Sequence, residues 1–234
     1  MIDYDKILNK TIKEIKPSGI RKFFDIAQEI DDVISLGVGE PDFPTPWSIR
    51  QKAIQTIENK RTIYTANAGL ESLRKSISNY TKRHINIEYD PKTEIVVTVG
   101  GSEAIDISIR TLVNPGDEVL IVEPCFVCYS PIVSLSGGVP VPIETKMEDN
   151  FKLTAEALKA KITDKTKLLI LPFPNNPTGA IMTRKDLEKI ADVLRDTDIM
   201  ILSDEIYSEL TYGRKHCSIA QIDGMRERTI MING

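Results

Sequence analysis

Short apolar runs alternate with amphipathic stretches from about residue 94 onward. Their continuous apolar character is typical of strands that are covered on both faces of a sheet. We therefore expect strands at 94–99, 118–123, 139–143, 167–172, 199–203 and 229–232. Strands that alternate with helices predict an α/β fold, here a three-layer α-β-α arrangement around a mostly parallel sheet. Ligands of such sheets bind beyond the carboxyl ends of the strands.

The amphipathic stretches keep their apolar residues at helical spacing. The clearest covers residues 183–196, where Thr183 and Asp186 have the spacing of a capping box. Two further helices are expected earlier in the chain, at 47–59 and 70–84. The apolar face of the second is formed by Leu73, Ile77 and Tyr80.

The composition is that of an ordinary soluble globular protein, with 41% hydrophobic and 27% charged residues. A net charge of −4 without a basic stripe gives no support to nucleic-acid binding. No apolar stretch has the length of a membrane span, and the acidic start lacks a signal-peptide core. Three cysteines make no disulfide framework, which is typical of a reducing compartment. We therefore expect a cytoplasmic protein without membrane or nucleic-acid partners.

Four residues have the chemistry of zinc ligands. Cys125 and Cys128 form a C-x-x-C pair, and His216 and Cys217 are adjacent. Neighbouring His and Cys side chains seldom converge on one tetrahedral ion, and no second spaced ligand pair is present. We expect three unpaired thiols and no metal site.

The stretch PNNPTG, residues 174–179, directly follows an apolar run. Its prolines end the strand, and Gly179 permits a sharp bend. Its asparagines, prolines and glycine are also ordinary turn residues. Two interpretations stay open: a plain turn, or an amide, that of Asn176, held rigidly at a ligand.

The stretch TVGGSEAID, residues 98–106, predicts a strand end, a glycine pair and the start of a helix. The free backbone N–H groups of Gly101, Ser102 and Glu103 and the helix dipole would form an anion site, most naturally for phosphate. A tight turn without a ligand explains the same pattern equally well.

Other strand ends carry an aromatic, a carboxylate and a phenol. Phe126 follows one apolar run, and Asp204 follows another, with Tyr207 three residues later. Core packing and helix capping would explain Phe126 and Asp204 separately. Together with the anion site and Asn176, these groups match a flat phosphorylated heteroaromatic ring with a basic nitrogen and a phenolic oxygen. Pyridoxal phosphate has all of these groups.

Three other motifs are absent or weaker. No glycine precedes a lysine, which excludes a Walker A loop, and GVGEPD lacks the third glycine of a dinucleotide site. GGSEA resembles a nucleophile elbow, and Ser102, Asp204 and His216 follow the chain order of α/β-hydrolases. The elbow serine normally follows several strands rather than the first, so a serine hydrolase is a remote alternative.

Seven motifs occur together in the order and spacing of one family. They are LGVGEPDFPTP, YTANAGLESLR, VTVGGSEAI, NPGDEV, EPCFVCY, PNNPTG and SDEIYSEL. On these motifs nearly the whole chain resembles the class I/II aminotransferases, which are fold-type I pyridoxal-phosphate enzymes. The resemblance implies the large domain of that fold behind an N-terminal arm. It also implies transfer of an amino group between an amino acid and a 2-oxo acid.

The resemblance assigns cofactor contacts to Gly101, Ser102, Glu103, Phe126, Asn176, Asp204, Tyr207 and, across a homodimer interface, Tyr64. Asp204 would keep the pyridine nitrogen protonated, so that the ring can act as an electron sink. Tyr207 and Asn176 would bond the phenolic oxygen, and Phe126 would stack on the ring. The backbone at the glycine pair would contact the phosphate. Gly39 would lie near the substrate α-carboxylate.

One family feature is not found in the sequence. In the family, an aromatic-Ser-Lys motif soon follows the last strand, and its lysine forms the Schiff base with the cofactor. Here that motif is expected just after Gly234, so we assign no catalytic residue. We expect residues 1–45 to form an arm with part of the small domain, and residues 46–234 to form a truncated large domain. Such a fragment would lack transaminase activity.

Two alternatives keep the resemblance and change the function. One is a C–S lyase of the same fold, which would eliminate at the β-carbon. The other is a non-catalytic binding or dimerisation module, which the missing lysine would allow.

Overall fold

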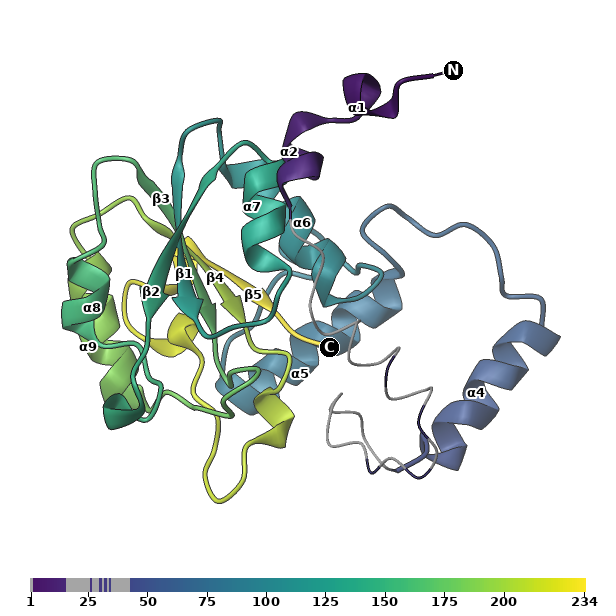
Figure 1. Ribbon diagram of the computed structural model, residues 1–234. Coiled ribbons are helices and arrows are strands. Elements are labelled where there is room, and N and C mark those ends of the chain that lie inside the picture. The colour runs from purple at the N-terminus through teal and green to yellow at the C-terminus, as the bar shows by residue number, and fades with distance from the viewer. Residues whose placement is uncertain (1, 16–25, 27–29, 31, 33, 35–42) are drawn as a thin grey trace.

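A five-stranded, entirely parallel sheet forms the centre of the molecule (Figure 1). The computed structural model describes residues 2–15, 26, 30, 32, 34 and 43–234. The strands are β1 (Glu118–Glu123), β2 (Val139–Glu144), β3 (Thr166–Pro172), β4 (Met200–Asp204) and β5 (Thr229–Ile232), in the spatial order β2-β1-β3-β4-β5. Five of the six expected strands are confirmed.

Helices cover both faces of the sheet, which confirms the three-layer arrangement (Figure 1). One face packs against α8 (Ala155–Lys159) and α9 (Arg184–Leu194), the other against α6 (Gly101–Leu112) and α7 (Tyr129–Leu135). Successive side chains of a strand point to opposite faces, so β3 serves both cores. Leu169 and Leu171 belong to the core on the α9 side. Leu168 and Ile170 belong to the core on the α6 side.

The other helices that the structure describes lie before the sheet in the sequence. They are α1 (Tyr4–Ile7), α2 (Lys10–Glu14), α4 (Trp47–Glu58) and α5 (Glu71–Ile85). Short 3-10 turns occupy Met147–Asp149, Ser208–Leu210, Ile219–Gln221 and Arg226–Arg228. None of the helices in the described part of the chain is long and apolar enough to cross a membrane.

The expected strand at 94–99 is wrong. In the described part of the chain no strand pairs with this segment, and Val97 makes a single backbone hydrogen bond, from its N–H to the carbonyl of Ala68. Val96 is 60% exposed and Val99 is 92% exposed. The β-branched side chains gave the segment a strand-like pattern, but a strand also needs a neighbour to satisfy its backbone groups.

Helix α5 buries a different face from the expected one. Its buried residues are Arg74, Ser78, Thr81 and Ile85, whereas Leu73 is 43% exposed. The Ser78 hydroxyl donates to the carbonyl of Tyr89 at 2.6 Å, and the Arg74 guanidinium donates to that of Pro91. The helix therefore packs on the carbonyl groups of the following loop. Buried carbonyls need donors, which explains polar side chains on this face.

Arg228 joins the ends of three elements. Its Nη1 donates to the carbonyls of Leu194 at 2.8 Å, Thr197 at 2.7 Å and Ile199 at 3.3 Å. The first of these carbonyls ends α9, and the third precedes β4. One guanidinium just before β5 thus bonds the last carbonyl of α9 and two carbonyls of the loop that leads to β4.

The capping box at the start of α9 is confirmed, and it gives the first test. The Thr183 hydroxyl accepts from the Asp186 N–H at 3.3 Å, and the Asp186 carboxylate accepts from the Thr183 N–H at 2.8 Å. Thr183→Ala should lower the free energy of unfolding by about 1 kcal/mol in guanidinium titrations. The exposed Lys185→Ala is the matched control. Equal stability of the two variants would show that the box contributes nothing.

Candidate active site

The candidate site lies at the carboxyl ends of the parallel strands. Pro172 of β3 pairs with Asp204 of β4, and Asp204 pairs with Ile232 of β5, so the segments after these strands leave the sheet side by side. A cavity of about 180 Å³ opens at this edge. Six of the predicted site residues line it: Gly101, Ser102, Phe126, Asn176, Asp204 and Tyr207. This is the edge at which α/β sheets bind ligands.

Asp204 places a buried carboxylate in this cavity. It is 7% exposed, and its two oxygens accept hydrogen bonds from the Tyr129 hydroxyl at 2.8 Å and the Ile206 N–H at 3.2 Å. Burial raises the pKa of Asp204 above its ordinary value, while the two hydrogen bonds act in the opposite direction. No lysine, arginine or histidine forms an ion pair with it among the described residues. A cationic N–H group in the cavity would complete its environment.

Tyr129 is a site residue that the sequence analysis missed. Its ring is 2% exposed, lies edge-on to Phe126 with the centroids 6.3 Å apart, and lines the same cavity. Burial and the neighbouring Asp204 carboxylate raise its pKa, so the hydroxyl is a donor over the physiological pH range. Its position three residues after Phe126 was the only sequence signal, because Asp204 is 75 positions away.

The two neighbouring asparagines in the turn after β3 have different environments. Asn175 is buried, donates to the carbonyl of Pro124 at 3.1 Å and accepts from the Thr178 hydroxyl at 2.8 Å. Its backbone bonds Gly179 and Ala180 on the other side of the turn. Asn176 is exposed and lines the cavity. Thus one amide holds the turn and leaves the next free to meet a ligand.

The start of α6 forms the third side of the cavity. Gly100 has φ +86°, which favours glycine, and no side chain caps the helix from this position. Gly101 and Ser102 line the cavity with the first turn. The Glu103 side chain lies elsewhere, because its carboxylate accepts from the Val99 N–H. A contact from Glu103 to a phosphate through its backbone therefore stays a prediction.

Tyr64 is a predicted residue that lies away from this cavity. The Tyr64 side chain is fully exposed and does not line it. Gly39 lies outside the described residues. Their roles remain predictions.

The remote hydrolase triad does not form. Nε2 of His216 lies 2.7 Å from a carboxylate oxygen of Glu205, and His216 lines a different cavity from Ser102 and Asp204. Both oxygens of Asp204 are bonded elsewhere, as described above. Sequence order alone suggested the triad, whereas adjacent positions 204 and 205 face opposite sides of the chain.

The cysteines are free thiols. Burial raises the pKa of Cys125 and of Cys128 to about 12, so neither is a thiolate at neutral pH. Among the residues that the structure places, no three His, Cys, Asp or Glu side chains form a potential metal site.

The donor set fits pyridoxal phosphate. A buried carboxylate suits a pyridinium nitrogen, the uncapped first turn of α6 suits a phosphate, and Phe126 contributes an aromatic ring to the cavity lining. The fold and this site define an α/β protein with a cofactor-type cavity at its strand ends.

The chain belongs to the aminotransferase class I and II family, whose model matches residues 31–232. It is 50% identical to the putative aminotransferase YugH of Bacillus subtilis over 97% of this chain. It is 46% identical to aromatic-amino-acid aminotransferase 2 of Thermococcus litoralis, also over 97%. In each case it spans 59% of the relative's length.

Solved structures give the same result. An aspartate aminotransferase from Thermus thermophilus superimposes with a TM-score of 0.91 at 34% identity, over 97% of this chain and 60% of that one. The aromatic aminotransferase from Pyrococcus horikoshii has a TM-score of 0.84 at 45% identity, over 92% and 57% of the two chains. The five-stranded sheet is thus part of a larger fold in these proteins.

The hydrogen bond from Tyr129 to Asp204 predicts a pH effect. Because the pKa of Asp204 is raised on folding, the folded chain holds this proton above the ordinary value of 3.8. The contribution of Asp204 to stability therefore falls as the pH rises from 3.8 to the folded pKa. Tyr129→Phe should raise the folded pKa further and lower the free energy of unfolding at pH 7 by about 1 kcal/mol.

Carbon-13 NMR of the Asp204 carboxyl and guanidinium titrations at several pH values measure these effects. Tyr212→Phe, at an exposed phenol, is the control. An unchanged carboxyl titration in Tyr129→Phe would contradict this role of the hydroxyl.

Proposed function

We propose that this chain forms the cofactor-binding part of a pyridoxal-phosphate-dependent aminotransferase, which moves an amino group between an amino acid and a 2-oxo acid. The observation that carries the proposal is the convergence of six predicted residues on one cavity at the strand ends. Family membership supports it. The relatives described above carry aminotransferase names, which favours amino transfer over β-elimination.

Asp204 is the residue that makes the proposed chemistry efficient. Pyridoxal phosphate supplies an electron-withdrawing ring, and a carboxylate beside its nitrogen maintains the protonated form of that ring. Asp204 is already buried and oriented by Tyr129 before any ligand arrives. The site therefore gains a charge partner on binding, without the cost of moving a carboxylate out of water at that moment.

The other cavity residues orient the ring. Tyr207 and Asn176 are proposed to donate hydrogen bonds to its phenolic oxygen, which tunes the basicity of that oxygen. Phe126 is proposed to cover one ring face and exclude water. The first turn of α6, from Gly101 on, is proposed to bind the phosphate through backbone N–H groups.

Several parts of the proposal extend beyond this cavity. The relative from Thermococcus litoralis is named for aromatic amino acids and the Thermus thermophilus structure for aspartate, so the substrate is proposed only as an amino acid and a 2-oxo acid. The full exposure of Tyr64 supports a homodimer in which this side chain reaches the partner's cofactor. The division into an arm at 1–45 and a large domain at 46–234, and a cytoplasmic location, are proposed on the same family basis.

The role of Asp204 can be tested by cofactor affinity. Asp204→Asn keeps the shape of the side chain and removes its charge, so the dissociation constant for pyridoxal phosphate should rise about tenfold or more. Absorbance titration of the purified chain measures this constant. Asp223→Asn, at a fully exposed carboxylate, should leave it unchanged. Equal affinities in all three proteins would contradict the assignment of the cavity.

A trapping experiment tests the absence of a reactive lysine. No lysine lines the cavity among the described residues, and residues 1–234 contain no aromatic-Ser-Lys sequence. Borohydride reduction of the chain mixed with pyridoxal phosphate should therefore leave no single modified lysine, as measured by intact mass and peptide mapping. One specific adduct would mean that this chain has its own Schiff-base residue.

A further inference from the structure

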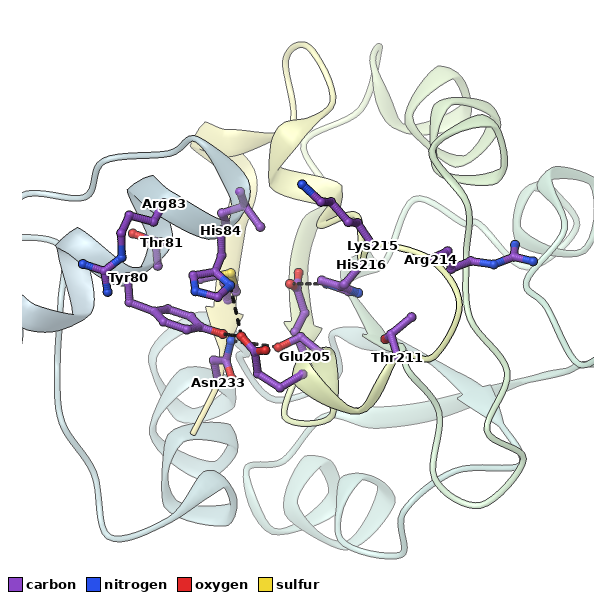
Figure 2. Close-up of a pocket in the computed structure, with 14 residues that line it drawn as sticks. Tyr80, Thr81, Arg83, His84, Glu205, Thr211, Arg214, Lys215, His216 and Asn233 are labelled. Carbon is purple, nitrogen blue, oxygen red and sulfur yellow. Dashed lines mark hydrogen bonds and ion pairs between the residues drawn. The ribbon is translucent and has the colours of Figure 1, made fainter. Parts of the chain in front are cut away.

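The turn Glu205–Glu209 separates two cavities. Ile206 and Tyr207 line the cavity proposed for the cofactor. Glu205, Ser208 and Glu209 line a second cavity of about 400 Å³ on the other side, drawn in Figure 2. Contacts that hold Glu205, Ser208 and Glu209 at the second cavity therefore also hold Tyr207 in place at the first.

Glu205 anchors the beginning of the turn. Its carboxylate is buried and accepts hydrogen bonds from Ser203 at 2.8 Å and Ser218 at 2.6 Å. The other oxygen lies 2.7 Å from Nε2 of His216, whose side chain is 13% exposed. The backbone N–H of Glu205 donates to Ile232 of β5 at 2.9 Å. Such a set of partners holds a buried carboxylate in one place.

Glu209 anchors the end of the turn to α5. It accepts a hydrogen bond from the Tyr80 hydroxyl and lies 3.1 Å from Nδ1 of His84. The rings of Tyr80 and His84 stack with their centroids 4.2 Å apart. Figure 2 shows these two rings on one side of the cavity and the Glu205–His216 pair on the other. Ser208, between the anchors, accepts from the Asn233 amide at 3.2 Å.

We propose that the pairs Glu205–His216 and Glu209–His84 are positioning pairs, which fix the turn so that Asp204 and Tyr207 face the cofactor. This inference rests on the proposed function. The chain has only two histidines, and both serve this turn. Asp204 and Tyr207 can both contact one ligand only if neighbouring side chains fix the turn that carries Tyr207.

The two pairs differ in strength. The Glu205–His216 pair is buried, whereas the His84 and Glu209 side chains are 45% and 59% exposed. Water screens exposed pairs, and loss of a partner costs most where the remaining group is buried. The His216 anchor should therefore dominate.

Amide hydrogen exchange of the unliganded chain tests the anchors directly. The reporters are the N–H groups of Ile206, Ser208 and Leu210, which donate to the Asp204 carboxylate, the Glu205 carbonyl and the Tyr207 carbonyl respectively. His216→Ala should lower their protection about tenfold, His84→Ala less than threefold. His216→Gln retains a donor and should restore protection. Lys215→Gln, whose side chain extends away from the pair in Figure 2, is the matched control.

The second measurement is made with pyridoxal phosphate. His216→Ala should weaken its affinity about tenfold and raise the pH midpoint of the bound cofactor's absorbance titration, because Tyr207 no longer donates reliably to the phenolic oxygen. His216→Gln should restore both values. A merely structural residue would change the thermal midpoint without moving the titration.

The results distinguish a failure of the proposed function from a failure of the positioning role. If the wild-type chain does not bind pyridoxal phosphate, the proposed function fails, and the exchange data alone decide on the anchors. Unchanged protection of the turn in His216→Ala would overturn the positioning role. A loss of protection spread evenly over the whole sheet would overturn it as well, since it would mark a general core residue.

Discussion

The parallel pairing of β3 with β4 is the constraint on which the rest of the structure depends. Both strands are buried on both faces, so their register is fixed by two cores at once. That register sets Pro172 beside Asp204 and brings the asparagine turn next to the acidic strand end. A slip by one residue would turn Asp204 away from the cavity. The position of the site is therefore defined largely by the packing of apolar side chains on both faces of these strands.

Two adjacent carboxylates at the end of β4 are stabilised in different ways. Glu205 is surrounded by three side-chain donors, whereas Asp204 receives two hydrogen bonds and is left open to a cavity. The carboxylate of Glu205 is satisfied within the chain and suits a structural role. The environment of Asp204 leaves room for a further donor and suits ligand binding. Strand geometry sends successive side chains to opposite sides, so one short segment can present both.

The sequence predicts the sheet and α9 well, because burial on both faces and capping leave patterns in neighbouring residues. It predicts the segment at 94–99 and the buried face of α5 badly. There the deciding groups are a missing neighbour strand and the loop carbonyl of Tyr89. The same distinction holds at the site. Asn176, Asp204 and Tyr207 are predicted from local motifs, whereas the hydrogen bond from Tyr129 to Asp204 joins residues 75 positions apart and leaves no local pattern.

The contacts of Arg228 have a consequence for the order of folding. The carbonyls at the end of α9 and before β4 receive their donor from a residue up to 34 positions downstream. While the chain emerges from the ribosome, α9 and β4 can form, but these carbonyls stay without that donor until Arg228 has been synthesised. Arg228, directly before β5, thus completes the hydrogen bonding of elements that precede it in the chain. The cooperative folding of α9, β4 and β5 should therefore be completed late, once β5 has been synthesised.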